Sequence, residues 1–229
     1  GSNAGDSFTG TDAVSNTLFG KDAGTAITSG DYNTAIGYQA LKSNTTGGYN
    51  TAIGWALQTN VTGANNVAVG FQALYNNTGS DNTAVGRDAL VTNTTGINNA
   101  AFGYTALKDN TTGGYNTSVG WQCMMDNTTA SFNVAMGCNA LRDNLTGADN
   151  TGVGREALKS NTASNNTAFG SQALVTNSSG TANTAVGYRP LSANTTGSYN
   201  TSVGADALYS NTTAAGNTAV GHESAKALT

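Results

Sequence analysis

Residues 33–49 read NTAIGYQALKSNTTGGY, and a close variant of this unit follows at once in residues 50–65. The opening phrase, Asn-Thr-Ala-Val-Gly or a variant of it, occurs thirteen times in the 229 residues. Its closing glycines lie 16 or 17 residues apart, at Gly20, Gly37, Gly54, Gly70, Gly86, Gly103, Gly120, Gly137, Gly154, Gly170, Gly187, Gly204 and Gly221. A short, fixed period over most of a chain is typical of a solenoid, in which each coil contacts only its neighbours.

One coil of the repeat reads N-T-A-V-G-x-x-A-L-x-x-N-T-T-G-x-x. The Asn-Thr-Ala-Val segment alternates and contains β-branched residues, which predicts a short strand. Thr and Val share one face of this strand, and Asn and Ala share the other. We expect the Thr and Val face to lie inside, so that Val and Leu are the inner anchors. The Gly and the Asn-Thr-Thr-Gly segment predict two turns, and the limb around Ala-Leu is either a second short strand or a single helical turn.

Asparagine opens every copy of the phrase. Equivalent residues in adjacent coils of a parallel solenoid lie ~4.8 Å apart, so stacked amides can hydrogen-bond from coil to coil. We interpret this column as a structural ladder. Its inner members are Asn33, Asn50, Asn66, Asn82, Asn99, Asn116, Asn133, Asn150, Asn166, Asn183 and Asn200.

Composition narrows the functions to consider. Charged residues make up only 10% of the chain, and the net charge is −4. Because there is neither a basic stripe nor a run of 18 apolar residues, we expect no binding to nucleic acid and no membrane contact by this segment. Residues 1–4 are typical of an expression-tag remnant, and residues 5–229 form a single repeat domain. Two cysteines, Cys123 and Cys138, are too few for a disulfide framework, and they are either bridged or free.

The phrase Asn-Thr-Ala-Ile-Gly, at residues 33–37 and 50–54, resembles the head repeat of YadA-like trimeric autotransporter adhesins. The longer unit resembles repeats in phage tail-fibre-like and bacterial surface proteins. The resemblance implies a left-handed β-roll, a parallel homotrimer, and a location outside the cell, on a bacterial surface or a virion tail fibre. The expected fold is thus an all-β parallel solenoid of about thirteen coils. Its thin core independently favours oligomerisation.

The function expected from these observations is structural and adhesive. The chain would be a non-catalytic segment of a trimeric surface or tail fibre, and it would project or contribute to a region that binds a host-surface glycan or protein receptor. The single histidine, His222, lies in the last and most degenerate coil, and no Ser-His-Asp or Cys-His pair can be assembled within the repeat. We therefore expect neither an enzyme nor a cofactor.

One column of the repeat is a candidate metal site. Asp109, Asp126 and Asp143 occupy the same position in three consecutive coils. Like charges stacked ~5 Å apart repel each other, and a bound Ca²⁺ would relieve that repulsion. The alternative is a solvated edge whose charge is offset by the neighbouring Lys108 and Arg142.

Two further columns suggest binding functions. The residue after the Gly is often aromatic, and Tyr104 and Trp121 are the candidate ligand-binding pair, since aromatic rings can stack on sugar rings. The alternative is that these rings pack between coils or between chains. The threonine columns raise a third class, the ice-binding β-solenoids, but an inward-facing strand Thr argues against it.

Overall fold

A computed structural model of the chain describes residues 4–5 and 13–227, so residues 1–3 of the tag remnant lie outside the description. All regular structure in the described residues is β: thirteen strands of three residues each, and no helix. The chain divides into two compact units, residues 1–115 and 116–229. Each unit is a parallel β-solenoid in its own right, which confirms the predicted fold class.

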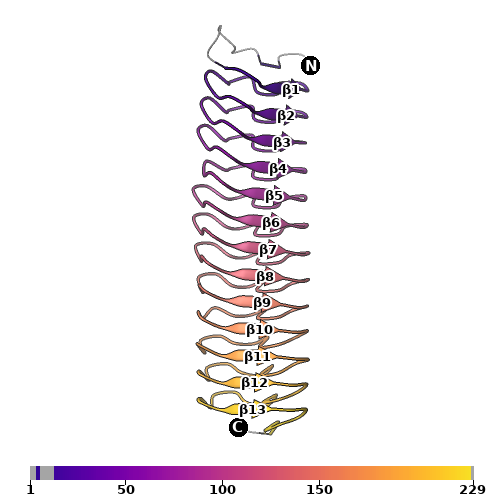
Figure 1. The fold of residues 1–229 in the computed structure, drawn as a ribbon, viewed down its shortest axis with the longest axis vertical. Helices are drawn as coiled ribbons and strands as arrows, with labels where there is room; N and C mark the ends of the chain where they lie inside the picture. The colour runs from indigo at the N-terminus through magenta and orange to yellow at the C-terminus, as the bar shows by residue number, and fades with distance from the viewer. Residues whose placement is uncertain (1–3, 6–12, 228–229) are drawn as a thin grey trace. The chain divides into compact units, whose positions relative to one another are not determined.

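The first unit contains six strands, one for each coil (Figure 1). They are β1 (Thr17–Phe19), β2 (Thr34–Ile36), β3 (Thr51–Ile53), β4 (Val67–Val69), β5 (Thr83–Val85) and β6 (Ala100–Phe102). Each strand pairs in parallel with the next, in a register that joins equivalent repeat positions, such as Ala35 with Ala52.

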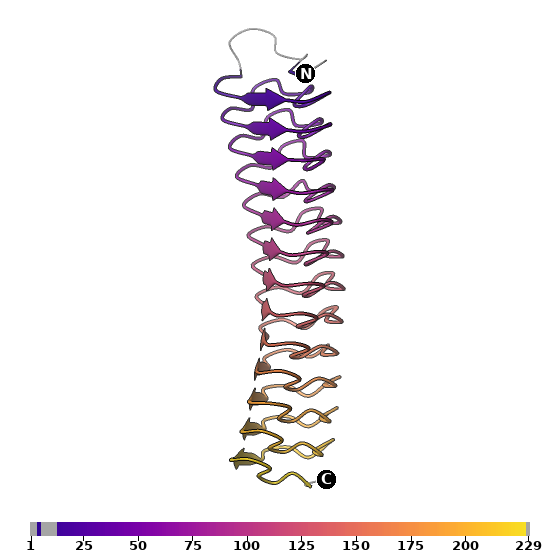
Figure 2. The same cartoon turned by 90° about the vertical axis from the view of Figure 1, so that its right-hand side faces the viewer.

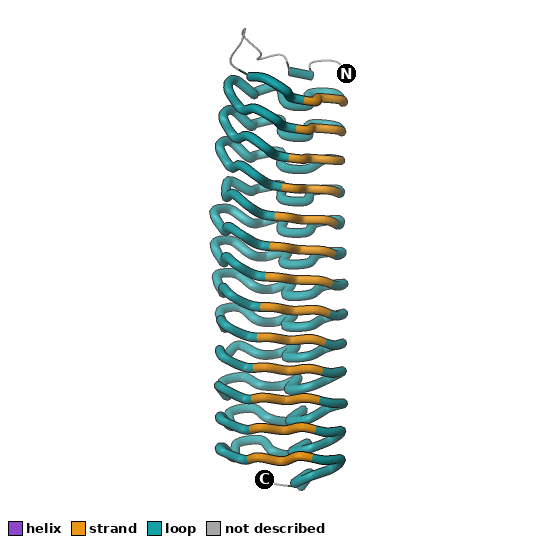
Figure 3. Tube along the Cα trace, in the orientation of Figure 1, coloured by secondary structure: helices purple, strands orange, loops and turns teal. Residues whose placement is uncertain are grey.

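The second unit contains seven strands in the same arrangement (Figure 3). They are β7 (Thr117–Val119), β8 (Val134–Met136), β9 (Thr151–Val153), β10 (Thr167–Phe169), β11 (Thr184–Val186), β12 (Thr201–Val203) and β13 (Thr218–Val220). Consecutive strands again pair in parallel and in register. Within each unit, the strands stack on one side of the coils, and the turn-rich limb forms the other side (Figure 2).

The strand face that we expected to lie inside is the outer one, and the face that we expected to lie outside is buried. The central alanines, such as Ala35 and Ala84, are fully buried, whereas Ile36 is 38% and Phe102 41% exposed. Thr and Val therefore face outward, and Val is not an inner anchor. The reason is the thinness of the coil: a Cβ added to Gly152, which takes the place of Ala in β9, would lie only 3.3 Å from the carbonyl oxygen of Ala157 across the interior.

The leucine column is buried, as predicted. Leu41, Leu107 and Leu174 have no exposed surface, and Met124 is equally buried in the one coil where it replaces Leu. The leucine side chain lies against the inward strand position, since a Cβ at Gly152 of β9 would lie 3.3 Å from Cγ of Leu141. The apolar core of each coil thus consists mainly of one Leu and the alanines of the two limbs.

The Ala-Leu limb is neither a strand nor a helical turn, so both expectations for it were wrong. Its backbone alternates in handedness, with φ +57° at Gln39 and +52° at Leu41. The N–H of Gln39 donates to the preceding coil, at Lys21, and that of Leu41 donates to the following coil, at Ala56. Bonds between coils thus alternate with local turn bonds, such as the one from the N–H of Lys42 to the carbonyl of Gln39.

The Gly that closes each strand is required by the backbone. Gly187 has φ +135°, and a Cβ at this position would lie 2.6 Å from the carbonyl oxygen of Gly204 in the next coil. Residues with a side chain rarely adopt that φ, and no side chain fits between Gly187 and the carbonyl of Gly204. The stacked glycines let successive coils approach closely at the corner between the two limbs.

Candidate functional site

The outer face of the strands is the most regular surface of each unit. No strand contains a charged residue, and the outward positions are mostly one Thr and one Val, Ile or Phe. The row is least interrupted in β9–β13, where Thr151, Thr167, Thr184, Thr201 and Thr218 are partners in consecutive pairs. We refer to these outward residues of β9–β13 as the Thr-Val face.

The structure separates the threonines into two classes. In the turns, the hydroxyl donates to a carbonyl of the next coil, as from Thr195 to Thr212 at 3.0 Å and from Thr176 to Ser192 at 2.8 Å. On the Thr-Val face, none of the five hydroxyls is hydrogen-bonded to another residue in the described part of the chain. The turn threonines therefore join coils, whereas those of the strands are available to solvent.

A cluster of aromatic rings lies on the first unit, and three of its four rings directly follow the glycines. Trp55 packs edge-on against Tyr38, Phe71 and Tyr75, with ring centroids 5.4–6.1 Å apart. The guanidinium carbon of Arg87 lies 5.6 Å from the ring centroid of Phe71. We call these five residues the aromatic corner.

The aromatic corner is a surface of packed rings and not a binding pocket. Tyr38 and Phe71 are about half exposed, while the indole Nε1 of Trp55 is buried and has no hydrogen-bond partner. No cavity is found among the described residues. A ligand at this corner would lie on the rings and would not enter a pocket.

The predicted pair Tyr104 and Trp121 is divided between the two units, and its adjacency stays a prediction. Tyr104 is 41% exposed, and its ring lies 5.9 Å from the guanidinium carbon of Arg87. Trp121 is 49% exposed in the second unit. The sequence pattern did not single out Trp55, although its ring packs against three other rings.

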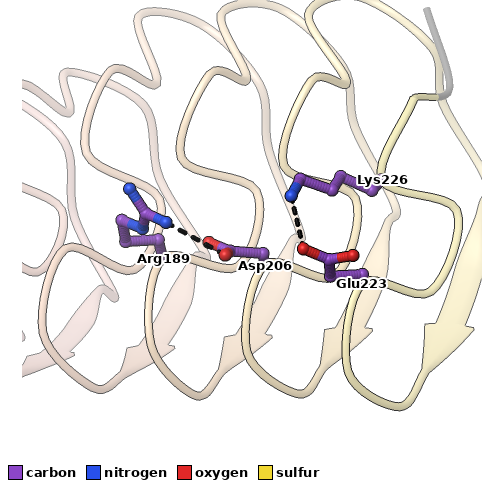
Figure 4. Close-up of polar contacts among 4 residues, drawn as sticks. All are labelled: Arg189, Asp206, Glu223 and Lys226. Carbon is purple, nitrogen blue, oxygen red and sulfur yellow. Dashed lines mark hydrogen bonds and ion pairs between the residues drawn. The ribbon is translucent and has the colours of Figure 1, made fainter.

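The second unit has a charged cluster at the equivalent corner (Figure 4). Arg189 pairs with Asp206 at 3.0 Å, and its guanidinium carbon lies 4.8 Å from the ring of Tyr188. One coil on, Lys226 donates to Glu223, and this hydrogen bond lowers the pKa of Glu223. Since opposite charges are paired in both cases, the cluster neutralises itself and offers little charge to a ligand.

The aspartate column is also divided between the units. Asp109 pairs with Lys108 at 3.3 Å in the first unit, while Asp143 pairs with Arg142 and accepts a hydrogen bond from Ser160 in the second. No group of three or more His, Cys, Asp or Glu side chains in the described ranges is placed to hold a metal ion. The calcium site stays a prediction, and the neighbouring cations are in place to offset the charge of Asp109 and Asp143.

The asparagine column forms a hydrogen-bonded ladder within each unit. Asn183 illustrates it: the backbone N–H donates to Oδ1 of Asn166 at 3.0 Å, and Nδ2 donates to the carbonyl of Gly197 at 2.8 Å. In turn, Oδ1 of Asn183 accepts the backbone N–H of Asn200. These asparagines are therefore used by the fold and are not available to a ligand.

The second asparagine of the repeat forms a parallel ladder with a different role. Nδ2 of Asn194 donates both to Oδ1 of Asn177 and to the carbonyl of Gly197 in its own turn. No backbone N–H depends on it. Three members of this column, Asn60, Asn144 and Asn211, even have a buried Oδ1 without a partner.

Both cysteines are free thiols, so the bridged alternative is not adopted. Cys123 is buried in the alanine column, and this burial raises its pKa to about 11. Cys138 is exposed, at the position after the Gly of its coil. The two differ because Cys123 occupies the buried column three residues after the Gly, whereas Cys138 occupies the column directly after the Gly.

The single histidine, His222, is exposed in the last described coil. A search of the described residues finds no helix capable of crossing a membrane. Comparison with known proteins gave no match to a family model, to a curated protein or to a solved structure.

Proposed function

We propose that this chain is a non-catalytic, structural segment of an extracellular fibre, on a bacterial surface or a virion tail. In this proposal its coils form a left-handed β-roll, and three chains associate in parallel. The observation that carries the proposal is the use of every invariant repeat position by the stack itself. The first asparagine column and the glycine column serve backbone contacts between coils, and the second asparagine column links coils through its side-chain amides. A stack of repeated coils whose recurrent residues serve the stack itself suits an elongated scaffold more than an enzyme.

The thin interior supports association between chains. One leucine and a few alanines provide little apolar burial for each coil, and thin scaffolds often gain stability by oligomerisation. The aromatic corner is the contact we propose, because large aromatic rings are enriched in interfaces between proteins. Tyr38 and Phe71 present apolar surface there that would be removed from water in a trimer.

Analytical ultracentrifugation of the purified chain tests the proposal. We expect three times the mass of one chain at micromolar concentration. Phe71→Ala should weaken the assembly, whereas Phe169→Ala should not, although the two rings are similarly exposed at 46% and 44%. A wild-type chain that sediments as a monomer would overturn the trimer.

A second candidate function is glycan binding along the aromatic corner. It is favoured by the contiguous, partly exposed rings of Tyr38, Trp55 and Phe71, since aromatic faces can stack on sugars. A glycan array probed with the wild-type chain tests it. Specific binding that is lost in Phe71→Ala, with the trimer intact, would identify the segment as an adhesin in its own right.

A further inference from the structure

We infer that the Thr-Val face of the second unit is an ice-binding surface. Ice is a neutral lattice whose water molecules each donate and accept hydrogen bonds. A protein surface that binds it needs hydroxyl and methyl groups at regular intervals and no charges that order water differently. The outward orientation of the strand threonines, found only in the structure, opens this possibility.

The first argument is register. Each Thr of β9–β13 pairs with the Thr of the next strand, so the row of Thr151, Thr167, Thr184, Thr201 and Thr218 continues over five coils without interruption. Parallel pairing sets the spacing within this row at ~4.8 Å, and two residues along a strand separate it from the aliphatic row by roughly 6.6 Å. The face therefore presents a two-dimensional array on the length scale of hydrogen-bonded water.

The second argument is the state of the hydroxyls. The turn threonines use theirs to bind the next coil, as at Thr176 and Thr195. Those of the Thr-Val face have no partner in the described part of the chain; the threonines of β9–β12 are partly buried, and Thr218 is exposed. A free hydroxyl beside a methyl group can anchor an ordered water without loss of an internal hydrogen bond.

The third argument is the absence of charge. No residue of β9–β13 is charged, and six ion pairs of the described residues lie on the Ala-Leu limb, as at Arg155 with Glu156 and Arg189 with Asp206. The aliphatic row beside the threonines consists of Val153, Phe169, Val186, Val203 and Val220. Charged side chains and sheet face are thus segregated, as a neutral lattice requires. Phe169 is the one bulky interruption, and the last three coils of the unit are free of it.

This inference goes beyond the proposed fibre role and does not depend on it. A single chain presents this face without any association between chains. The competing occupant is a second copy of the chain, packed sheet against sheet. The experiment below separates the two.

The test uses the whole chain in two assays, inhibition of ice recrystallisation and partition of the labelled protein into a slowly growing ice crystal. We expect the wild type to inhibit recrystallisation and to enter the ice. Thr184→Lys places a long, charged side chain in the middle of the face and should abolish both activities. Thr196→Lys, at an exposed turn position, should retain both.

Circular dichroism and sedimentation of each variant complete the design. If Thr184→Lys does not fold, Thr201→Lys is measured in its place, and the wild-type result decides independently of either. A wild-type chain that is excluded from ice overturns the inference, as does a folded Thr184→Lys chain with full activity. If the wild type does not bind ice and the lysine variant sediments as a smaller species than the wild type, the face is an interface between copies of the chain.

Discussion

The strand limb and the Ala-Leu limb of one coil both bond to the neighbouring coils, but their backbone conformations differ. The strand uses extended residues, and each Thr or Val of β11 lies directly beside its equivalent in β12. The Ala-Leu limb alternates in handedness, with φ +59° at Gln172 and +51° at Leu174. Left-handed geometry costs ~1–2 kcal/mol for each such residue. It persists because the stacked coils on both sides determine the backbone more strongly than local preference does.

The difference has a consequence for the surface. A regular strand places the same groups at the same point of every coil, which leaves an uncharged, ordered outer face. The Ala-Leu limb instead carries the ion pairs and most aromatic contacts of the described residues, and these vary from coil to coil. Repetition is thus strictest where the backbone is simplest, and the variable side chains are concentrated where the backbone is strained.

The largest effect should come from the corner where the two limbs meet. Gly187→Ala forces a side chain into φ +135° and against the carbonyl of Gly204. We expect a loss of about 3 kcal/mol from backbone strain alone, and the collision adds to it. Gly152→Ala is the control, because the equivalent strand position holds Ala in most coils and a Cβ there would come no closer than 3.3 Å to its neighbours, so it should cost only about 1 kcal/mol. Denaturant unfolding of both variants measures the difference, and equal losses would contradict it.

The next effect concerns which limb anchors the core. Leu174→Ala removes a fully buried side chain and should cost about 2–5 kcal/mol through the cavity it leaves. Val186→Ala, on the outward side of β11, should cost about 1 kcal/mol or less. The free energy of unfolding decides. A larger loss of unfolding free energy in Val186→Ala than in Leu174→Ala would mean that the Thr-Val face is buried.

The two asparagine ladders should differ as well. Asn183→Ala deprives the buried backbone N–H of Asn200 of its acceptor, which we expect to cost about 2–3 kcal/mol. Asn194→Ala leaves the carbonyl of Gly197 with its second donor, from Asn183, and should cost about 1 kcal/mol. Melting temperatures that fall equally in the two variants would show that the ladders are equivalent.

The smallest effect tests the left-handed backbone directly. Ala182 is exposed and has φ +55°, so Ala182→Gly should stabilise the chain, by about 1 kcal/mol at most, because glycine adopts this geometry without penalty. Ala193→Gly, on the Ala-Leu limb at a residue without positive φ, should instead destabilise by about 0.5–1 kcal/mol. The midpoints of denaturant unfolding should therefore move in opposite directions.

Periodicity was sufficient to predict the solenoid, the strand positions and the buried leucines. It was insufficient for the Ala-Leu limb, since a strand and a helical turn were the only regular alternatives and the actual backbone is neither. Alternating handedness at Gln39 and Leu41 has no signature in residue type, because neither residue favours positive φ by itself. The aromatic corner was predicted only as a column of rings, and the central place of Trp55 depends on packing between coils.

The sequence by itself determined the repeat, its period and the residues that recur in every coil, because each of these follows from stacking identical units. Tertiary structure decided which side of the strand faces inward. Alternation divides Thr and Val from Asn and Ala but does not say which pair is buried. The narrow interior settles that choice, since only alanine, serine or glycine lies beneath the strands from β2 to β13, and the unbonded hydroxyls of Thr184 and its neighbours are left outside as a result.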